Sequence, residues 1–382
     1  MADVLILFGH RPDIPMKVER RHLDAVQAAC SGKVYYYQTE EEALADGVDA
    51  EVLFLWGGSG RMPEAWCASS KRLKWINSFS AGVNPIMDGP ISDLPVRLTN
   101  AKGIHGKTMG VTTMGYIISF LRHFPTMLRQ QREHVWDKTT VTFMEPTGLT
   151  VGIIGAGAIA GEVARLCKSM DMTVLGVKRT VTPLEHYDRV YPNTELDTVL
   201  AASDFVVILT PLTDATRGMI GAAQLAKMKP TGVLINIARG PVVDTEALVE
   251  ALQKGIIGGA ALDAVDPEPL PADSPLWDME QVILTPHCAA DSTLYMDRAM
   301  EQFCENLKHF EQGEPLPPCI TKGAWSAMTE KENVLHALRH DGKAEWIANI
   351  TDSVRFFTVP QSRDKVKEGL DWFGVRWRDF SP

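Results

Sequence analysis

The sequence has no run of apolar residues long enough to cross a bilayer as a helix, which takes about 18 to 20 residues. It also has no N-terminal secretion signal. The opening MADVLILFGHRPD holds a short apolar run, with no basic stretch before it and no small-residue cleavage site. We therefore expect this run to be a first β-strand, and we expect no membrane contact.

Cysteine is scarce, and its spacing fits neither a metal site nor a disulfide framework. There is no CxxC pair and no Cys/His ligand spacing, so we expect no structural zinc and no bound metal. Cysteines without such a framework are typical of a reducing compartment, so the predicted location is cytoplasmic. The six cysteines are Cys30, Cys67, Cys167, Cys288, Cys304 and Cys319.

Positive charge is in deficit. The chain has 38 Lys and Arg against 48 Asp and Glu, a net charge of −10, and no long basic run stands out. This balance disfavours nonspecific nucleic-acid binding. Apolar residues at 45% and charged residues at 23% are typical of a folded globular protein, and 382 residues fit two domains better than one.

Short apolar runs alternate with amphipathic stretches over the first hundred residues. This rhythm predicts a small βα domain with a parallel sheet. The four runs that we expect to be strands are residues 4–8, 33–37, 51–56 and 74–80.

A longer α/β region follows. Residues 107–131 predict a helix that breaks or bends at Pro125. Six near-continuous apolar strands with helical connections come next and indicate a doubly wound parallel sheet. They begin at TVGIIG, MTVLGVKR, DFVVILTP, GVLINIARG, GGAALDAV and VILTPH.

The C-terminal part is of a different kind. A long helical pattern over 292–312 is expected to return the chain to the first domain. Residues 320–382 contain no βα repeat but hold four of the nine tryptophans, so we expect them to pack on the first domain or, preferably, on a neighbouring subunit. Within this tail, 330–340 and 364–373 have helical spacing.

The segment GAGAIA follows the first strand of the second region and opens a helix, where a dinucleotide-binding loop belongs. Gly155 permits the tight turn, Gly157 allows close approach of a pyrophosphate, and Ala160 suits close helix–strand packing. Backbone N–H groups at the helix start, including those of Ala158 and Ile159, would face the phosphates. The alternative is a tight βα turn that binds nothing.

The end of the next strand bears on the choice of cofactor. NAD-binding sites usually have a carboxylate there, whereas this strand ends in Lys178, Arg179 and Thr180, with Asp171 at its opposite end. These cations and the hydroxyl suit a 2′-phosphate, so NADP(H) is favoured. The alternative is that they are solvated surface cations and that NAD(H) is also accepted.

Three further motifs, NIARG, LDAVDPEP and LTPHCA, place Arg239, Glu268 and His287 just beyond apolar strands. Ligand sites of α/β sheets form at this edge. Taken singly, these residues could be a surface cation, a capping carboxylate and a strand-end histidine. Their joint occurrence in this order favours a catalytic set.

On these motifs the sequence resembles the D-isomer specific 2-hydroxyacid dehydrogenases, and among them the glyoxylate and hydroxypyruvate reductases. The resemblance covers residues 1–318, most specifically 148–290, and includes LTNAKGIHG and PLTDATRGMI. It implies a flavodoxin-like substrate domain (1–101, completed by 292–319), a Rossmann nucleotide-binding domain (102–291), a C-terminal extension (320–382), and a homodimer.

The resemblance also implies an activity, the transfer of a hydride between NAD(P)H and a 2-keto acid or D-2-hydroxy acid. His287 would be the general acid/base, because a histidine ordinarily titrates near neutral pH. Glu268 would orient the ring and favour the imidazolium form. Arg239 would bind the substrate carboxylate and carbonyl in a forked geometry.

Further site residues follow from the same resemblance. Asp263 would receive the nicotinamide carboxamide, and the amides of Ala81, Gly82 and Val83 in SAGVN would bind the substrate carboxylate. The remaining residues expected at the cofactor are Thr210, Pro211, Thr216, Ile237, Ala238, Ala289 and Ala290, together with Arg239 and His287.

Two features leave room for another interpretation. Val111 stands where the family usually has an acidic residue, and the tail matches nothing in the family pattern. The first puts in doubt the contacts that relatives make at this position. A non-catalytic, corepressor-like NAD(H)-binding regulator on the same fold is the second hypothesis, because such relatives keep the catalytic residues and the added tail could serve a partner protein. His10, Trp56 and Arg61 are candidates for the wall of the substrate pocket, or else packing and surface groups.

Overall fold

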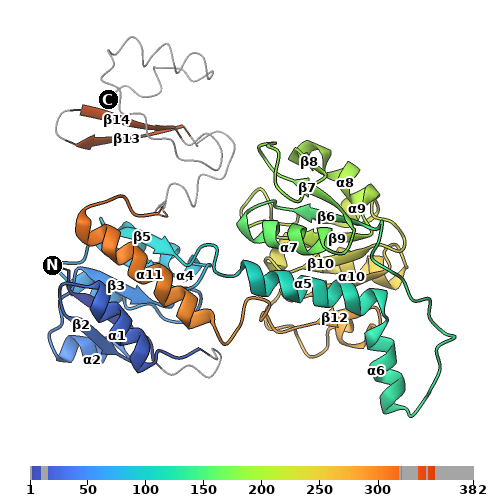
Figure 1. The fold of residues 1–382 in the computed structure, drawn as a ribbon, viewed down its shortest axis with the longest axis horizontal. Helices are drawn as coiled ribbons and strands as arrows, with labels where there is room; N and C mark the ends of the chain where they lie inside the picture. Colours follow the sequence, from blue (N-terminus) through green and yellow to red (C-terminus); the bar gives the residue numbers. More distant parts are fainter. Residues whose placement is uncertain (1, 10–15, 318–319, 321–333, 341–342, 349–382) are drawn as a thin grey trace, which may run out of the picture. The chain divides into compact units, whose positions relative to one another are not determined.

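The computed structural model describes residues 2–9, 16–317, 320, 334–340 and 343–348. The chain divides into two compact units, residues 1–325 and 326–382. The larger unit contains two parallel β-sheets with helices between their strands, which confirms the predicted fold class (Figure 1).

The first sheet has five parallel strands in the order β2-β1-β3-β4-β5, which is the flavodoxin-like order. All four predicted strands are present. The fifth, β5, was not predicted, because RLTN is a short edge strand in which three of the four residues are polar. The elements are β1 (Val4–Leu7), α1 (Arg20–Ala29), β2 (Val34–Tyr37), α2 (Glu40–Ala45), β3 (Val52–Leu55), α3 (Glu64–Ser69), β4 (Trp75–Ser78), α4 (Asn84–Met87), η1 (Pro90–Asp93) and β5 (Arg97–Asn100).

The second sheet has seven parallel strands in the order β12-β11-β10-β9-β6-β7-β8. The order reverses between β6 and β9, as in a dinucleotide-binding fold. All six predicted strands are found, and the missed one, β8, is a three-residue edge strand. The elements are β6 (Thr150–Ile154), α7 (Ala158–Lys168), β7 (Thr173–Val177), β8 (Arg189–Tyr191), η2 (Asn193–Glu195), α8 (Leu196–Ala202), β9 (Phe205–Ile208), α9 (Ala222–Leu225), β10 (Val233–Asn236), η3 (Gly240–Val242), α10 (Thr245–Gln253), β11 (Gly259–Leu262), η4 (Pro275–Asp278) and β12 (Val282–Leu284).

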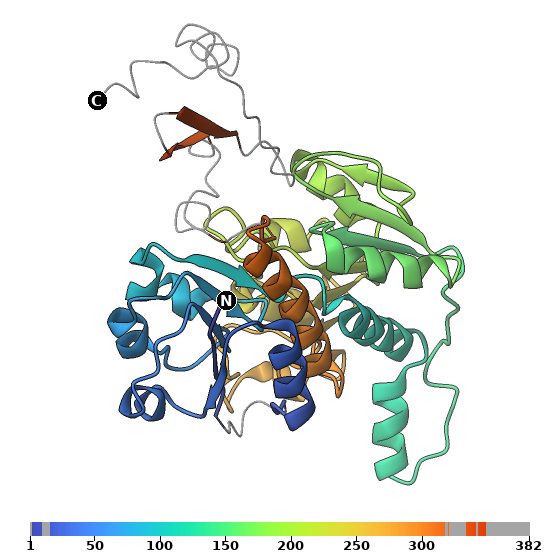
Figure 2. The same cartoon turned by 60° about the vertical axis from the view of Figure 1, so that its left-hand side comes forward.

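Each sheet has an apolar cluster on both of its faces, which explains why its central strands are apolar throughout. Helix α11 (Tyr295–Gln312) follows the last strand of the second sheet but packs on the first. Its Phe303 is fully buried against Phe54 and Trp75. Figures 1 and 2 show α11 lying beside α1.

The helix predicted over 107–131 is two helices, α5 (Gly106–Leu121) and α6 (Phe124–Arg132). The break falls at Arg122 and His123, slightly before Pro125. His123 has a left-handed backbone (φ 51°), and Pro125 occupies the first turn of α6, where its missing N–H is not needed.

In the smaller unit, β13 (Val334–His340) and β14 (Lys343–Ala348) form an antiparallel hairpin. The helix predicted over 330–340 is therefore wrong for residues 334–340. A short apolar run can satisfy either periodicity, and here cross-strand pairing supplies the backbone hydrogen bonds. The helix predicted over 364–373 lies outside the described residues.

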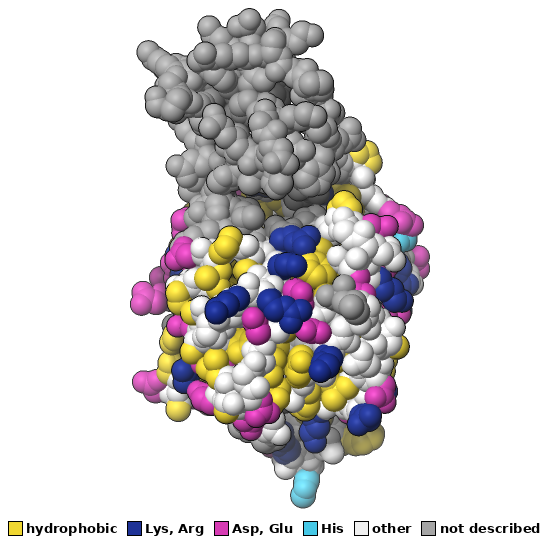
Figure 3. Space-filling view, turned by 90° about the vertical axis from the view of Figure 1, so that its left-hand side faces the viewer, with side chains coloured by type: hydrophobic (Ala, Val, Ile, Leu, Met, Phe, Trp, Pro, Cys, Tyr) yellow, Lys and Arg dark blue, Asp and Glu magenta, His cyan; other side chains and the backbone are white. Residues whose placement is uncertain are grey.

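Within the described residues, no helix is both long and apolar enough to span a bilayer. The five cysteines in that part of the chain have no disulfide partner. On the face shown in Figure 3, basic and acidic side chains lie interspersed. Some of the charges in the described residues form ion pairs: Arg72 pairs with Asp3 and Glu51 at 2.8 Å each.

Candidate active site

The dinucleotide loop leaves β6 at Gly155, whose left-handed backbone (φ 96°) and crowded surroundings require glycine. A Cβ atom there would lie 2.6 Å from the backbone nitrogen of Thr210. The N–H groups of Gly155 and Ala156 donate to the carbonyl of Val177, at 3.0 and 3.2 Å. The carboxyl ends of β6, β7 and β9 are thereby brought together around this loop.

Helix α7 begins directly after this turn, with Gly157 as its N-cap. No side chain caps the helix, and a Cβ on Gly157 would meet no atom within 4 Å, so the backbone is open to an approaching group. Ala158 is exposed and Ile159 half-buried, whereas Ala160 is buried against the sheet. The first N–H groups of α7 can therefore receive an anionic pyrophosphate.

The segment directly after β7 consists of Lys178, Arg179 and Thr180. It begins one residue beyond Val177, whose carbonyl accepts the N–H groups of the glycine loop. Lys178 continues the pairing of β7 with β8 through its N–H, which donates to Tyr191 at 3.0 Å. Asp171 lies at the amino end of β7, where its carbonyl accepts the N–H of Gly148. The positions next to the loop thus carry cations and a hydroxyl.

The loop after β9 carries Thr210, Pro211 and Thr216. The hydroxyl of Thr216 donates to the carbonyl of Pro211 at 2.6 Å and accepts the N–H of Thr213 at 2.8 Å. Thr216 therefore holds the shape of this loop, while the backbone of Thr210 faces the glycine turn.

Asn236 holds the turn that presents Arg239. Its side-chain amide donates to the carbonyls of Arg239 (3.1 Å) and Ala264 (3.2 Å), and its oxygen accepts the N–H of Ala238 at 3.1 Å. Asn236 is 1% exposed. The sequence analysis gave it no role, although NIARG contains it. Gly240 is also required here, since a Cβ would lie 1.8 Å from the carbonyl oxygen of Val265.

The side chain of Arg239 is half-buried, and its Nη1 donates to the carbonyl of Ala238 at 2.7 Å. Burial lowers the pKa of Arg239, and the carboxylate of Glu268 opposes this shift. Arginine stays cationic through such a change, and partial burial strengthens its attraction for an anion. Ile237 and Ala238, which precede it, are buried.

His287 and Glu268 form an ion pair, with His287 Nδ1 2.6 Å from Glu268 Oε1. Both side chains are about two-fifths exposed, at 42% and 41%. The pair leaves Nε2 as the ring nitrogen that can meet a ligand. The backbone of His287 is left-handed (φ 52°), which non-glycine residues rarely adopt.

Asp263 shapes the loop around His287. Its carboxylate accepts the hydroxyl of Thr285 at 2.6 Å and the N–H groups of Cys288 and Ala289 at 2.9 Å each. Its carbonyl accepts the N–H of His287 at 2.9 Å. A carboxylate offers about four acceptor sites, so these three bonds leave one site for a further N–H donor.

In the first sheet, the loop after β4 holds Ala81, Gly82 and Val83. The hydroxyl of Ser80 donates to the carbonyl of Gly82 at 2.7 Å, and the amide of Asn100 donates to that of Ala81 at 2.6 Å. Both carbonyls are thus engaged by side chains. In the described part of the chain, the three N–H groups of this loop have no acceptor.

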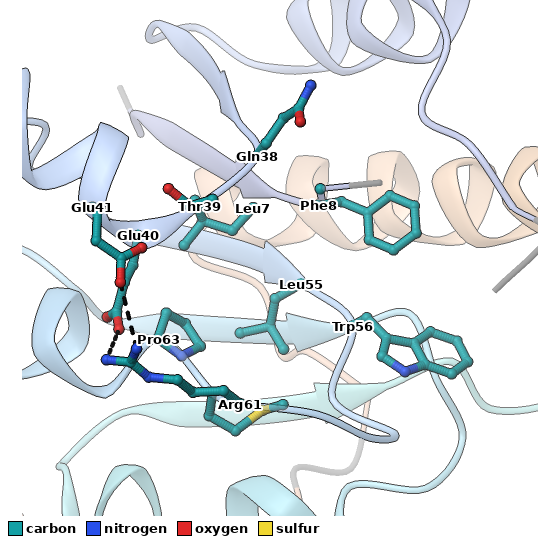
Figure 4. A pocket seen from close by; sticks show the side chains of 12 residues that line it. Leu7, Phe8, Gln38, Thr39, Glu40, Glu41, Leu55, Trp56, Arg61 and Pro63 are labelled. Carbon is teal, nitrogen blue, oxygen red and sulfur yellow. Dashed lines mark hydrogen bonds and ion pairs between the residues drawn. The ribbon is translucent and has the colours of Figure 1, made fainter. Parts of the chain in front are cut away.

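A cavity of about 320 Å³ opens at the carboxyl ends of β1, β2 and β3. Trp56 and Arg61 line it, as the sequence analysis considered, while His10 lies outside the described residues. Arg61 is bound to Glu40 at 3.1 Å and Glu41 at 3.5 Å (Figure 4). Its charge is therefore already compensated.

A buried hydrogen-bonded chain connects α5 with the loop after β4. His105 Nε2 lies 2.8 Å from the hydroxyl of Tyr295, and that hydroxyl donates to the carbonyl of Phe79 at 2.9 Å. Burial lowers the pKa of His105 to about 4, with a contribution from the charges of Arg239 and Arg298. His105 lies in the motif LTNAKGIHG, to which the sequence analysis assigned no role, and no sequence pattern marked Tyr295.

Comparison with known proteins identifies the family of this chain. Residues 114–289 match the model of the NAD-binding domain of D-isomer specific 2-hydroxyacid dehydrogenases. A glyoxylate reductase of Thermofilum pendens is 35% identical over 286 residues, which are 73% of this chain and 80% of the relative.

Two solved structures are also similar. A D-isomer specific 2-hydroxyacid dehydrogenase family protein of Aeromonas salmonicida has a TM-score of 0.72 and 29% identity, over 84% of this chain and 99% of that one. An NADPH-dependent glyoxylate/hydroxypyruvate reductase of Sinorhizobium meliloti, in complex with NADP and sulfate, has a TM-score of 0.71 and 28% identity, over 85% of this chain and 99% of that one. The chain therefore belongs to the D-isomer specific 2-hydroxyacid dehydrogenase family, and the prediction of an NAD(P)-dependent dehydrogenase is confirmed.

Proposed function

We propose that this protein reduces a small 2-keto acid to the D-2-hydroxy acid, with Arg239, Glu268 and His287 as its catalytic residues. The observation that carries the proposal is the 2.6 Å pair of His287 and Glu268 at the same sheet edge as Arg239 and the glycine loop. In this arrangement a proton donor, its orienting carboxylate and an anion-binding cation share the edge at which a dinucleotide would bind.

The chemistry requires a hydride on the carbonyl carbon and a proton on its oxygen. When bound, the nicotinamide supplies the hydride. His287 donates the proton from Nε2, since Nδ1 is held by Glu268. Arg239 binds the carboxylate and the carbonyl oxygen and stabilises the alkoxide that develops there. The N–H groups of Ala81 to Val83, for which the described residues provide no acceptor, support binding of the same carboxylate.

NADPH is the proposed cofactor. Lys178, Arg179 and Thr180 stand beside the glycine loop and can bind a 2′-phosphate through charge-assisted hydrogen bonds. The N–H groups at the start of α7 would hold the pyrophosphate. A similar protein from Sinorhizobium meliloti is described as NADPH-dependent, and its substrates, glyoxylate and hydroxypyruvate, are the first choice here.

The domain boundaries predicted from sequence fit this division of labour. We place the carboxylate-binding loop in the substrate domain, 1–101 with 292–319, and the cofactor and catalytic residues in 102–291.

A homodimer is also proposed. Exposed apolar side chains gather on α5, α6 and the segment after α6, which projects in both views (Figures 1 and 2). They are Val111, Phe124, Leu128, Val135, Trp136, Phe143 and Met144.

The test is a panel of 2-keto acids with NADPH and NADH, read as loss of nicotinamide absorbance in the wild type and two variants. His287→Ala should lower kcat by a factor of about 10² or more, and Arg239→Ala at least as much, with weaker keto-acid binding. Near wild-type turnover by His287→Ala would contradict the mechanism. Tight NADH binding without turnover of any keto acid would favour the regulatory alternative.

A further inference from the structure

Three hydroxyl side chains on α5 are bonded to the segment that contains His287. Thr108, Thr112 and Tyr116 are spaced by four residues, so they lie on one face of the helix. Thr108 and Thr112 donate to the carbonyls of Ala290 and Ala289, each at 3.2 Å. Thr108 shares its proton with the carbonyl of His105, at 3.0 Å.

The third member, Tyr116, reaches the other end of the same segment. Its hydroxyl lies 2.5 Å from Thr285 Oγ1. Thr285 has one hydroxyl proton, which goes to the carboxylate of Asp263 at 2.6 Å, so Tyr116 is the donor to Thr285. Burial raises the pKa of Tyr116 to about 12, so the hydroxyl keeps the proton that this bond needs.

These contacts hold the backbone on both sides of His287. Thr285 precedes it, Ala289 and Ala290 follow it, and Asp263 binds the N–H groups of His287, Cys288 and Ala289. The left-handed conformation of His287 persists only where its surroundings enforce it. Because the imidazole is 42% exposed, side-chain packing alone does not orient it.

We propose that Thr112 and Tyr116 are positioning residues for the proton transfer, acting through the backbone of residues 285–290. Together with Asp263, they keep the imidazole of His287 against Glu268 and aimed at the substrate. This inference rests on the proposed role of His287. It gives α5 a part in the reaction that none of the sequence motifs indicated.

The experiment compares Thr112→Val and Tyr116→Phe with Thr113→Val. Thr113 is a matched control, because it is buried on the same helix and its hydroxyl donates only within the helix, to Met109 at 2.7 Å. Each positioning variant should lower kcat about 5- to 10-fold, as loss of one hydrogen bond does, and the double variant about 50-fold. KM for the keto acid and the Kd for NADPH should change less than twofold.

Two further readouts separate positioning from folding. If His287 is displaced, proton transfer becomes slower, so the solvent deuterium isotope effect on kcat should rise in Thr112→Val and Tyr116→Phe but not in Thr113→Val. Thr112→Ser, which retains the hydroxyl, should restore kcat to within about twofold of the wild type.

Some outcomes would overturn the inference. One is a kcat loss no larger than that of Thr113→Val; another is an unchanged isotope effect. His287→Ala, measured in parallel, separates the two levels of the argument. If it abolishes turnover while the α5 variants match the control, only the positioning role fails. If it stays active, the proposed function fails first.

Discussion

The buried His105 should make the protein lose stability as the pH falls from 7 to 4. Its side chain is 3% exposed, and its pKa is lowered from 6.5 to about 4. In the unfolded chain this histidine binds a proton below about pH 6.5, whereas in the folded protein it stays neutral until the pH approaches 4. The folded state therefore binds fewer protons than the unfolded state across this range. As a result, the free energy of unfolding decreases as the pH is lowered.

The size of the effect follows from the shift. One pKa unit corresponds to about 1.4 kcal/mol, so a shift from 6.5 to about 4 represents about 3 kcal/mol at full development. Between pH 7 and pH 5 about 2 kcal/mol of this should be lost. That is a large part of the stability of an ordinary domain, about 5 to 15 kcal/mol.

The assay is urea unfolding followed by tryptophan fluorescence at pH 7, 6 and 5, for the wild type and His105→Gln. Glutamine keeps a donor for Tyr295 but does not titrate. Between pH 7 and pH 5 the His105→Gln variant should therefore lose about 2 kcal/mol less of its free energy of unfolding than the wild type. Tyr295→Phe is the control: it removes the hydroxyl, lowers stability at every pH by about 1 kcal/mol, and keeps the slope. Equal slopes for the wild type and His105→Gln would refute the reasoning.

Three further predictions concern the cofactor, the active-site turn and assembly. The double variant Lys178→Ala with Arg179→Ala should raise the Kd for NADPH by at least about tenfold and leave that for NADH nearly unchanged, as measured by fluorescence titration; equal losses would indicate a structural role. Gly240→Ala should remove most activity, because its methyl group would collide with the carbonyl of Val265; full turnover and an unchanged Tm would contradict this. Leu128→Asp with Trp136→Asp should shift the mass in solution, measured by light scattering, from dimer to monomer, while Ile256→Asp, at an exposed apolar residue outside this segment, should not.

The strands that sequence predicted and those it missed differ in how apolar their own residues are. Apolar clusters cover both faces of each sheet, so strands β1, β3, β6 and β9 to β11 are apolar on both faces. Their uniform apolar runs are easily recognised in the sequence. Strands β5 and β8 lie at sheet edges, where one side is solvated and polar residues such as Arg97 and Arg189 are tolerated. These two strands form because they can hydrogen-bond to the adjacent strand, and no local sequence pattern indicates that pairing.

The site residues were predictable for a topological reason. In a parallel sheet, every carboxyl end lies at one edge, so Gly155, Lys178, Arg239 and Asp263 lie along the same edge once the strands are known. The pairing of Glu268 with His287 was expected from the resemblance, but its geometry depends on two loops that leave different strands. Sequence gave no means of knowing that Arg61 is engaged by Glu40 and Glu41, because that contact depends on the path of the loop after β3.

The hydrogen-bond partners of the site residues are the part that sequence motifs left out. Asn236 ties the turn of Arg239 to Ala264, and Asp263 ties the loop of His287 to β11. In both cases a buried polar side chain binds backbone groups of a segment far away in sequence. A buried polar group is costly unless it is hydrogen-bonded, so such residues are fixed by the backbone that they satisfy. The proposed catalytic residues therefore lie in loops whose shape is fixed by these buried side chains. A substitution at Asn236 or Asp263 should consequently alter catalysis even though His287 and Glu268 are themselves unchanged.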